Sequence, residues 1–246
     1  MDNISSHRVS TGSFDIDKWL KGGYERDVIT MIAGPPGSGK TNMCMLAACS
    51  QAKNGSKVIF MDTEGGFSTE RVNQIAGEYS EEVMKNIFLL NPTNFEEQNS
   101  HFLNLFKNLK KEQVSMIVID GVAMLYRIEI GEALTSKDEE KVKKINMAIA
   151  GYMRMLSEIS RKQKIPIILS NQVYGNFLSE EDWKKGVQKK MSIVGGDLFK
   201  YWCKCIIELK KEGVRRKAIL SKHRSIPQTE INFEIKDNGI FKKGWI

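Results

Sequence analysis

The chain has 246 residues, of which 41% are hydrophobic and 27% charged, so it can bury a large core without disulfides or metals. This composition excludes intrinsic disorder, collagen and disulfide-rich miniproteins. No uninterrupted apolar run approaches the roughly 18 residues of a membrane span, and the polar first residues are unlike a signal peptide. We expect one domain over residues 1–246, located in the cytoplasm, with no membrane contact.

The net charge of +7 comes from one late segment. Between Lys184 and Arg224 there are 13 Lys and Arg residues and three acidic ones, so this segment holds the whole positive surplus. Such a segment predicts a surface that binds a polyanion, although a basic face that contacts only solvent explains the charge equally well. The four cysteines have no zinc-site spacing, which predicts reduced, buried thiols: Cys44, Cys49, Cys203 and Cys205.

The predicted elements alternate along the chain. Short apolar runs rich in β-branched residues predict buried strands at 28–33, 57–61, 87–90, 116–119 and 165–169. Longer amphipathic stretches between them predict helices at about 41–53, 69–79, 94–111 and 138–163. After residue 195, runs near 203–209, 217–220 and 230–235 predict antiparallel strands, and Asp237-Asn238-Gly239 predicts a hairpin turn. The expected fold is α/β, with a mostly parallel central sheet flanked by helices and a C-terminal antiparallel extension.

A phosphate-binding loop is the strongest motif. The pattern G-x-x-x-x-G-K-[ST] is matched, between a predicted strand and a predicted helix, by Gly34, Pro35, Pro36, Gly37, Ser38, Gly39, Lys40 and Thr41. Backbone N–H groups of such a loop surround phosphate oxygens at a helix N-terminus. We expect Lys40 to bridge the β- and γ-phosphates of ATP, Thr41 to ligate Mg²⁺, and Asn42 to complete the nucleotide-binding set.

Three further polar residues end predicted strands. Asp120 follows a buried strand, where a carboxylate can complete the magnesium shell. Glu64 follows the second strand, where it can polarise an attacking water. Gln172 follows the fifth strand, where its amide can sense the γ-phosphate and pass its presence to the next loop. From the residues alone, simple capping explains Glu64 and Gln172 equally well.

Together these motifs resemble the RecA superfamily of recombination ATPases, within it the archaeal RadA group, and most closely the short RadA paralogues called RadB. The resemblance spans nearly the whole chain and rests on ordered segments: residues 10–12 and 20–23 before the loop, 62–71, 171–173 and 195–197. It implies a RecA-type ATPase core, with Glu64 as water activator, Arg71 as the platform that stacks on adenine, Asp120 as the magnesium-shell acid and Gln172 as the γ-phosphate sensor.

Two departures limit this resemblance. Only 33 residues precede Gly34, too few for the helical N-terminal DNA-binding domain of full-length recombinases, and no F-x-x-A filament-linking motif occurs. Both argue against independent filament assembly and strand exchange. The resemblance therefore implies a RadB-like accessory or mediator with weak, DNA-dependent ATPase activity. Its implied partners are single-stranded DNA and a full-length recombinase or a junction nuclease. The resemblance is also compatible with an oligomer.

Two regions are candidates for DNA contact. The stretch 174–194 has no strong periodicity, and its lysines can engage backbone phosphates: Lys184, Lys185, Lys189 and Lys190. A mobile loop folded back on the protein explains this stretch nearly as well. The second region is a predicted basic cluster that spans residues 215–224: Arg215, Arg216, Lys222, His223 and Arg224. Alternatives for its Lys-His-Arg run are an edge facing a neighbouring protomer's nucleotide, or a solvated turn.

By resemblance, the segment from residue 121 to 137 is a first DNA loop, although its acidic residues argue against strong DNA contact. Two other functions remain open at this point. One is a nucleotide-dependent scaffold that recruits a recombinase or nuclease with little turnover. The other is a signalling ATPase of the same fold with no DNA role.

Overall fold

The computed structural model describes residues 7–108, 113–175 and 191–244. Its main sheet has the strand order β12-β11-β10-β9-β3-β7-β6-β4-β5, with β8 paired to the end of β7. The parallel strands are β3 (Ile29–Gly34), β4 (Lys57–Asp62), β5 (Ile87–Leu90), β6 (Val114–Asp120), β7 (Ile167–Gly175) and β9 (Cys205–Glu212). The antiparallel strands are β8 (Met191–Ile193), β10 (Arg215–Lys222), β11 (Thr229–Lys236) and β12 (Gly239–Lys242).

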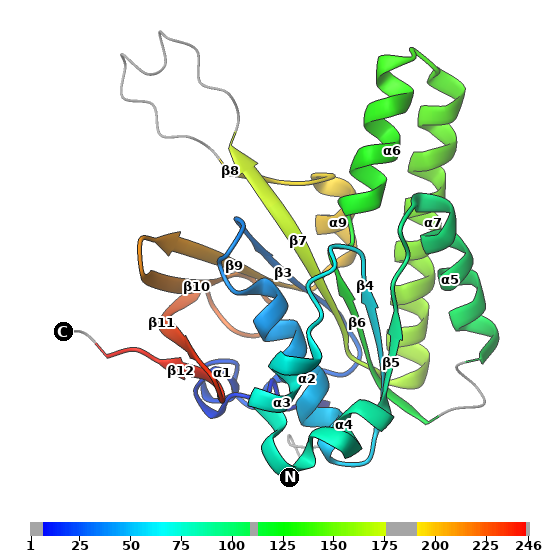
Figure 1. Cartoon of the computed structure of the whole chain (residues 1–246). Helices are drawn as coiled ribbons and strands as arrows, with labels where there is room; N and C mark the ends of the chain where they lie inside the picture. Colours follow the sequence, from blue (N-terminus) through cyan, green and yellow to red (C-terminus); the bar gives the residue numbers. More distant parts are fainter. Residues whose placement is uncertain (1–6, 109–112, 176–190, 245–246) are drawn as a thin grey trace, which may run out of the picture.

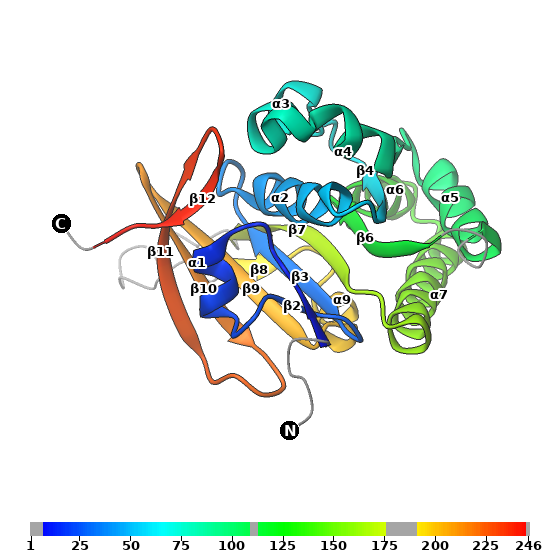
Figure 2. The same ribbon diagram turned by 90° about the horizontal axis from the view of Figure 1, so that it is seen from below.

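Helices cover both faces of this sheet (Figure 2). One face carries α1 (Phe14–Trp19), α2 (Lys40–Lys53), α3 (Thr69–Ala76) and α4 (Ser80–Asn86). The other carries α5 (Phe95–Asn108), α6 (Met124–Thr135), α7 (Glu139–Gln163) and α9 (Asp197–Trp202). A separate two-stranded sheet joins β1 (Arg8–Val9) to β2 (Tyr24–Glu25). None of the described helices is long and apolar enough to cross a membrane.

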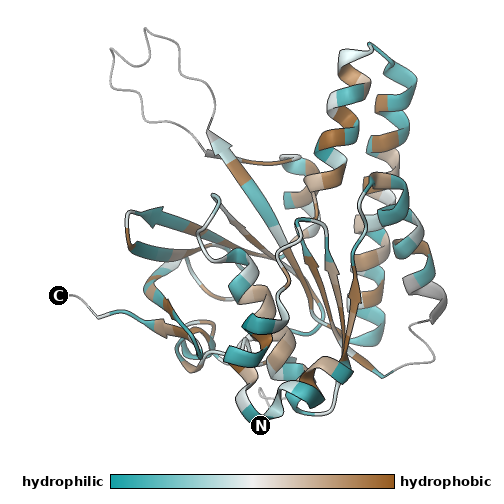
Figure 3. Cartoon of the chain, viewed as in Figure 1, coloured by the Kyte–Doolittle hydropathy of each residue, from teal (hydrophilic) through white to brown (hydrophobic). Residues whose placement is uncertain are grey.

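The two cores follow from the period of a β-strand. In β6, Met116 and Val118 point into the α2 core, whereas Ile117 and Ile119 point into the α7 core. Successive side chains of a strand face opposite sides, so a strand buried on both faces reads as a continuous apolar run. Figure 3 shows these central strands as largely hydrophobic, whereas the flanking helices alternate between hydrophilic and hydrophobic residues. The predicted α/β class, with its C-terminal antiparallel strands, is confirmed.

Parts of the sequence prediction are wrong in detail. The predicted helix 69–79 ends at Ala76, because Gly77 adopts a positive φ of 59°, and a 3₁₀ turn (Gly77–Tyr79) leads into the unpredicted α4. The predicted first DNA loop at 121–137 is largely helix α6. Tyr126 fixes it against α7, because its hydroxyl donates to Asn146 Oδ1 at 2.9 Å. The prediction of a long connector over residues 174–194 is also wrong at its two ends, because these ends belong to β7 and β8 and pair with each other.

The four cysteines are free and buried, as predicted. Burial raises the pKa of Cys49, Cys203 and Cys205 to about 12. A thiol with such a pKa stays protonated and unreactive at neutral pH. Among the described residues, no group of three or more His, Cys, Asp or Glu side chains is placed to hold a metal ion.

Phe199 packs α9 against α6. Its ring is fully buried and packs edge-on against Tyr126, with ring centroids 6.1 Å apart. Replacing Phe199 by Ala is expected to lower the free energy of unfolding by about 3–5 kcal/mol, because a large buried ring leaves a cavity. Urea denaturation measures the change. The matched control is Phe14→Ala, which removes an exposed ring and is expected to change stability by about 0.5 kcal/mol or less. Equal effects of the two substitutions would contradict the packing role.

Candidate nucleotide site

The phosphate loop lies between β3, which ends at Gly34, and α2, which begins at Lys40. Gly37 and Gly39 adopt positive φ angles of 69° and 109°, which L-residues with side chains rarely adopt. The Ser38 hydroxyl is buried and has no hydrogen-bond partner among the described residues. A buried polar group without a partner is costly, so this orphan hydroxyl marks a place where a polar ligand fits.

Lys40 is folded back onto its own loop. Its Nζ donates to the carbonyl oxygens of Gly34 at 3.0 Å and Pro35 at 3.2 Å. Burial lowers the pKa of Lys40, while the carboxylates of Glu64 and Asp120 oppose that shift. The ammonium group is therefore held at the loop by weak acceptors that a phosphate oxygen can replace.

Asp120 is the buried acid of the site, with only 1% of its surface exposed. Its Oδ1 accepts a hydrogen bond from the Ser170 hydroxyl, whereas Oδ2 has no partner among the described residues. A Cβ built on Gly66 would lie 3.4 Å from Thr41 Oγ1 and 3.6 Å from Asp120 Oδ2, so both oxygens border the same small space. Burial raises the pKa of Asp120, while the hydroxyls of Ser170 and Thr41 oppose that shift. A hydroxyl and an unpaired buried carboxylate oxygen form a donor set that fits Mg²⁺.

Asp62 shapes the loop that carries Glu64. Its Oδ1 accepts from the backbone N–H groups of Glu64 at 3.0 Å and Gly65 at 2.9 Å, and its Oδ2 accepts from Phe67 N–H at 2.7 Å. The Thr63 hydroxyl contacts the carbonyl oxygens of Asp120 and Gly121 at 3.1 and 2.7 Å. The loop after β4 is thus tied to the end of β6. The sequence prediction assigned no structural role to Asp62 or Thr63. The only sign of such a role in the sequence is that both are polar and directly follow a predicted buried strand.

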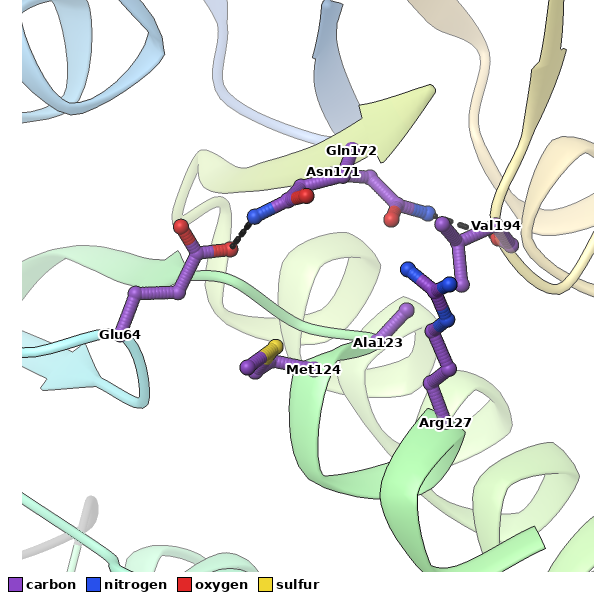
Figure 4. Close-up of a pocket in the computed structure, with 7 residues that line it drawn as sticks. All are labelled: Glu64, Ala123, Met124, Arg127, Asn171, Gln172 and Val194. Atoms are coloured by element: carbon purple, nitrogen blue, oxygen red, sulfur yellow. Dashed lines mark hydrogen bonds between the residues drawn. The ribbon is translucent and has the colours of Figure 1, made fainter. Parts of the chain in front are cut away.

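Glu64 and Gln172 meet across the site, where Gln172 Nε2 donates to Glu64 Oε1 at 3.0 Å (Figure 4). The two side chains line a pocket together with residues at the start of α6, in β7 and directly after β8: Ala123, Met124, Arg127, Asn171 and Val194. Directly after Gln172, Val173 pairs with Ile193 of β8. Gln172 is therefore one residue from the first residue pair of the β7–β8 hairpin, so a change in its hydrogen-bond partner acts next to that hairpin.

Arg71 joins three elements. Its Nε donates to Asn42 Oδ1 at 2.8 Å, and its Nη groups donate to the carbonyl oxygens of Lys236 and Asp237 at 2.9 and 2.7 Å. Asn42, expected to contact nucleotide, thus orients Arg71. The guanidinium plane is held at the turn between β11 and β12. A fixed guanidinium plane suits stacking on a base, the role that the resemblance implies for Arg71.

The predicted DNA-binding residues do not form one group. The four lysines of the 174–194 stretch lie outside the described residues. Arg215 and Lys222 stand at opposite ends of β10, roughly 24 Å apart at the usual rise of a strand. Arg215 and Arg216 lie at the carboxyl edge of the sheet, on the side of the phosphate loop, because β10 is antiparallel to β9. A single basic cluster over 215–224 is therefore wrong.

His223 and Arg224 have partners within the protein. Arg224 binds Asp27 through both Nη groups, at 3.0 and 2.7 Å, and its Nε lies 3.0 Å from Glu25 Oε2. The His223 side chain is only 2% exposed, and its Nδ1 accepts the backbone N–H groups of Ser225 and Ile226, each at 3.1 Å. An imidazole that accepts at Nδ1 is not a cation. Their role in DNA contact stays a prediction, and these partners weaken it.

Replacing Gly121 by Ala tests the placement of Glu64. Gly121 has a φ of 85°, and a Cβ there would lie 2.6 Å from Glu64 Cγ and 2.5 Å from Thr63 Oγ1. We expect Gly121→Ala to displace Glu64 and to slow ATP turnover at least about tenfold, with nucleotide affinity changed much less. Steady-state hydrolysis and fluorescent-nucleotide titration measure the two effects. Gly131→Ala in α6 is the control, because nothing lies within 4 Å of its Cβ position.

The buried His223 predicts acid sensitivity. Burial lowers the pKa of His223, with Arg8, Arg224 and Lys21 acting in the same direction and Glu25 opposing them. The unfolded chain then binds more protons, so this contribution to stability is complete above about pH 6.5 and is lost as the pH falls through the folded-state pKa. Urea denaturation between pH 7.5 and pH 5 is expected to show a smaller loss for His223→Asn, which keeps an acceptor without titrating, than for the wild type. Equal losses would contradict it.

Comparisons with known proteins identify the family of this chain. The Rad51 family profile matches residues 4–243. The DNA repair and recombination protein RadB of Methanosphaera stadtmanae is 38% identical over 98% of both chains, and that of Methanobrevibacter smithii is 37% identical over 96% of both. A crystal structure of the RadB recombinase has a TM-score of 0.73 and 31% identity, covering 94% of this chain and 97% of that one. The expected RecA-type fold is confirmed, and the chain belongs to the Rad51 family, among its RadB members.

Proposed function

We propose that this protein binds ATP with Mg²⁺ and binds DNA, and that it acts in DNA recombination and repair as an accessory protein with weak ATPase activity. The observation that carries the proposal is the convergence of Thr41 and the unpaired Asp120 oxygen beside the phosphate loop, with Glu64 and Gln172 bonded across from them. Relatives named as DNA repair and recombination proteins support the same assignment.

The residues of the chain divide the work at the nucleotide. The phosphate loop offers backbone N–H groups, and Lys40 exchanges the carbonyls of Gly34 and Pro35 for phosphate oxygens. Thr41 and Asp120 would hold Mg²⁺, which supplies charge neutralisation at the phosphates. Arg71, oriented by Asn42, would support the adenine. Together these contacts bind and orient the nucleotide before any hydrolysis.

The hydrogen bond between Glu64 and Gln172 supports the proposal of weak turnover. A general base needs a free carboxylate oxygen within reach of the attacking water. Glu64 Oε1 already accepts a hydrogen bond from the amide of Gln172, so water would compete with that amide for this oxygen. The same bond supports the second candidate function, a nucleotide-dependent scaffold with little turnover.

DNA contact at the carboxyl edge would be coupled to the nucleotide. A Cβ built on Gly37 would lie 3.2 Å from Lys211 Nζ, so the basic end of the β9–β10 hairpin flanks the phosphate loop. This end carries Arg215 and Arg216, which we propose contact DNA phosphates. Gln172 would report phosphate occupancy through Val173 to the β7–β8 hairpin, which leads into the segment holding Lys184, Lys185, Lys189 and Lys190. A full-length recombinase or a junction nuclease is the proposed protein partner.

Single-turnover ATP hydrolysis tests the catalytic assignment. We expect Glu64→Gln to slow phosphate release by about 100-fold or more while nucleotide binding persists, because the amide cannot accept a proton. We expect single-stranded DNA to accelerate the wild type and not this variant. Glu70→Gln, which alters an exposed acid in the first turn of α3, is the matched control. Unchanged phosphate release in Glu64→Gln would reject Glu64 as the water activator and favour the scaffold.

A further inference from the structure

The ammonium group of Lys211 in β9 lies against the phosphate loop. A Cβ built on Gly37 would lie 3.2 Å from Lys211 Nζ, so the ammonium occupies the space beside the Cα of this glycine. β9 pairs in parallel with β3 and so runs past the loop that follows β3. Strand and loop are in contact, because a Cβ built on Gly34 would lie 2.9 Å from Leu209 Cβ. The fold therefore holds a second lysine close to the proposed phosphate site.

Lys211 has no acceptor of its own. Within residues 7–108, 113–175 and 191–244 it makes no hydrogen bond and no ion pair, and its side chain is exposed. Lys40, by contrast, donates to two carbonyl oxygens of its loop, and Lys217 of β10 pairs with Glu230 at 2.9 Å. The Lys211 ammonium is therefore available to an anion that enters the loop.

A second cation lies directly beside Lys211. Arg216 of β10 is its cross-strand neighbour, and Arg216 Nε is buried without a hydrogen-bond partner in the described part of the chain. The next residue in this row is Phe233 of β11, whose ring lies 3.6 Å from a Cβ built on Gly39. The row of Lys211, Arg216 and Phe233 thus contacts the phosphate loop at both ends. Two cations opposite each other on neighbouring strands repel, and an anion at the loop relieves that repulsion.

The alternation of side chains along β9 separates Lys211 from the adjacent Lys210. Leu209 packs in the core that contains α2, so Lys211, two residues further on, projects to the same face of the sheet. Lys210 projects to the opposite face. It is also exposed, and it also makes no ion pair with a described residue. The chain therefore offers a matched control one residue away.

We propose that Lys211 binds the phosphate chain of the nucleotide as a second lysine beside Lys40, and that it favours a triphosphate over a diphosphate. The attraction of an ammonium group grows with the negative charge of the phosphate chain, and a triphosphate carries more of that charge. Arg216 stays the proposed contact for DNA, so nucleotide and DNA bind neighbouring cations. This inference rests on the proposed nucleotide binding and assigns a further residue to it.

Titration of the full chain with fluorescent ATP and ADP, each with Mg²⁺, tests the assignment. We expect Lys211→Gln to weaken ATP affinity roughly 3- to 10-fold and ADP affinity less, because one charge-assisted contact is lost. Lys211→Arg keeps the charge and is expected to retain most of the affinity. Lys210→Gln, the matched control, is expected to change either affinity by less than about twofold. Thermal melting confirms that each variant folds.

Salt dependence and chemical protection separate a phosphate contact from a structural role. Raising the salt from about 0.1 M to about 1 M is expected to narrow the difference between Lys211→Gln and the wild type, because the Debye length falls to about 3 Å. Lysine acetylation followed by peptide mass mapping gives a direct readout. ATP with Mg²⁺ is expected to slow acetylation of Lys211 and not of Lys210, whereas single-stranded DNA alone is expected to leave Lys211 reactive.

Three results overturn the inference. If the wild type binds no nucleotide, the proposed function and the role of Lys211 fail together. If the wild type binds ATP while Lys211→Gln and Lys210→Gln bind it equally well, only the role of Lys211 fails. If DNA and not ATP protects Lys211 from acetylation, this lysine contacts DNA instead of the nucleotide.

Discussion

The buried carboxylate of Asp120 is the constraint on which the nucleotide site depends. Removing a carboxylate from water is costly unless it is hydrogen-bonded or meets a cation. Ser170 satisfies one oxygen and also accepts the backbone N–H of Gly121 at 2.8 Å, so a single hydroxyl joins the ends of β6 and β7. The other oxygen stays unpaired beside Thr41. The fold thus stabilises half of the carboxylate and leaves the other half for a ligand.

The remaining parts of the site are arranged around that carboxylate. Asp62 lies beside Asp120 on the neighbouring strand, and it uses both oxygens to shape the loop that presents Glu64. Two adjacent acids therefore have separate roles, because one is saturated with backbone hydrogen bonds and the other is not. Glu64 then meets Gln172, whose strand continues into the β7–β8 hairpin. The strand β7 therefore connects the Glu64–Gln172 hydrogen bond at the nucleotide site to the β7–β8 hairpin.

The two edges of the sheet carry different surfaces. The parallel strands run in one direction (Figure 1), so the sheet has a carboxyl edge and an amino edge. The carboxyl edge holds the phosphate loop and the basic end of β9–β10, whereas the amino edge holds Lys222 and the ion pairs of Arg224.

Local sequence determined much of this protein. The phosphate loop, the buried strands and the Asp237-Asn238-Gly239 turn depend on glycine conformation and on the period of apolar residues, which act over a few positions. Tertiary structure alone decided that Ser170 satisfies Asp120, that Gly121 makes room for Glu64, and that α6 is a helix packed on α7. It also separated Arg215 from Lys222 and brought Lys222 to the carbonyl oxygen of Lys200 in α9. Those outcomes depend on which strands become neighbours, and contacts between residues distant along the chain are not encoded in any one segment.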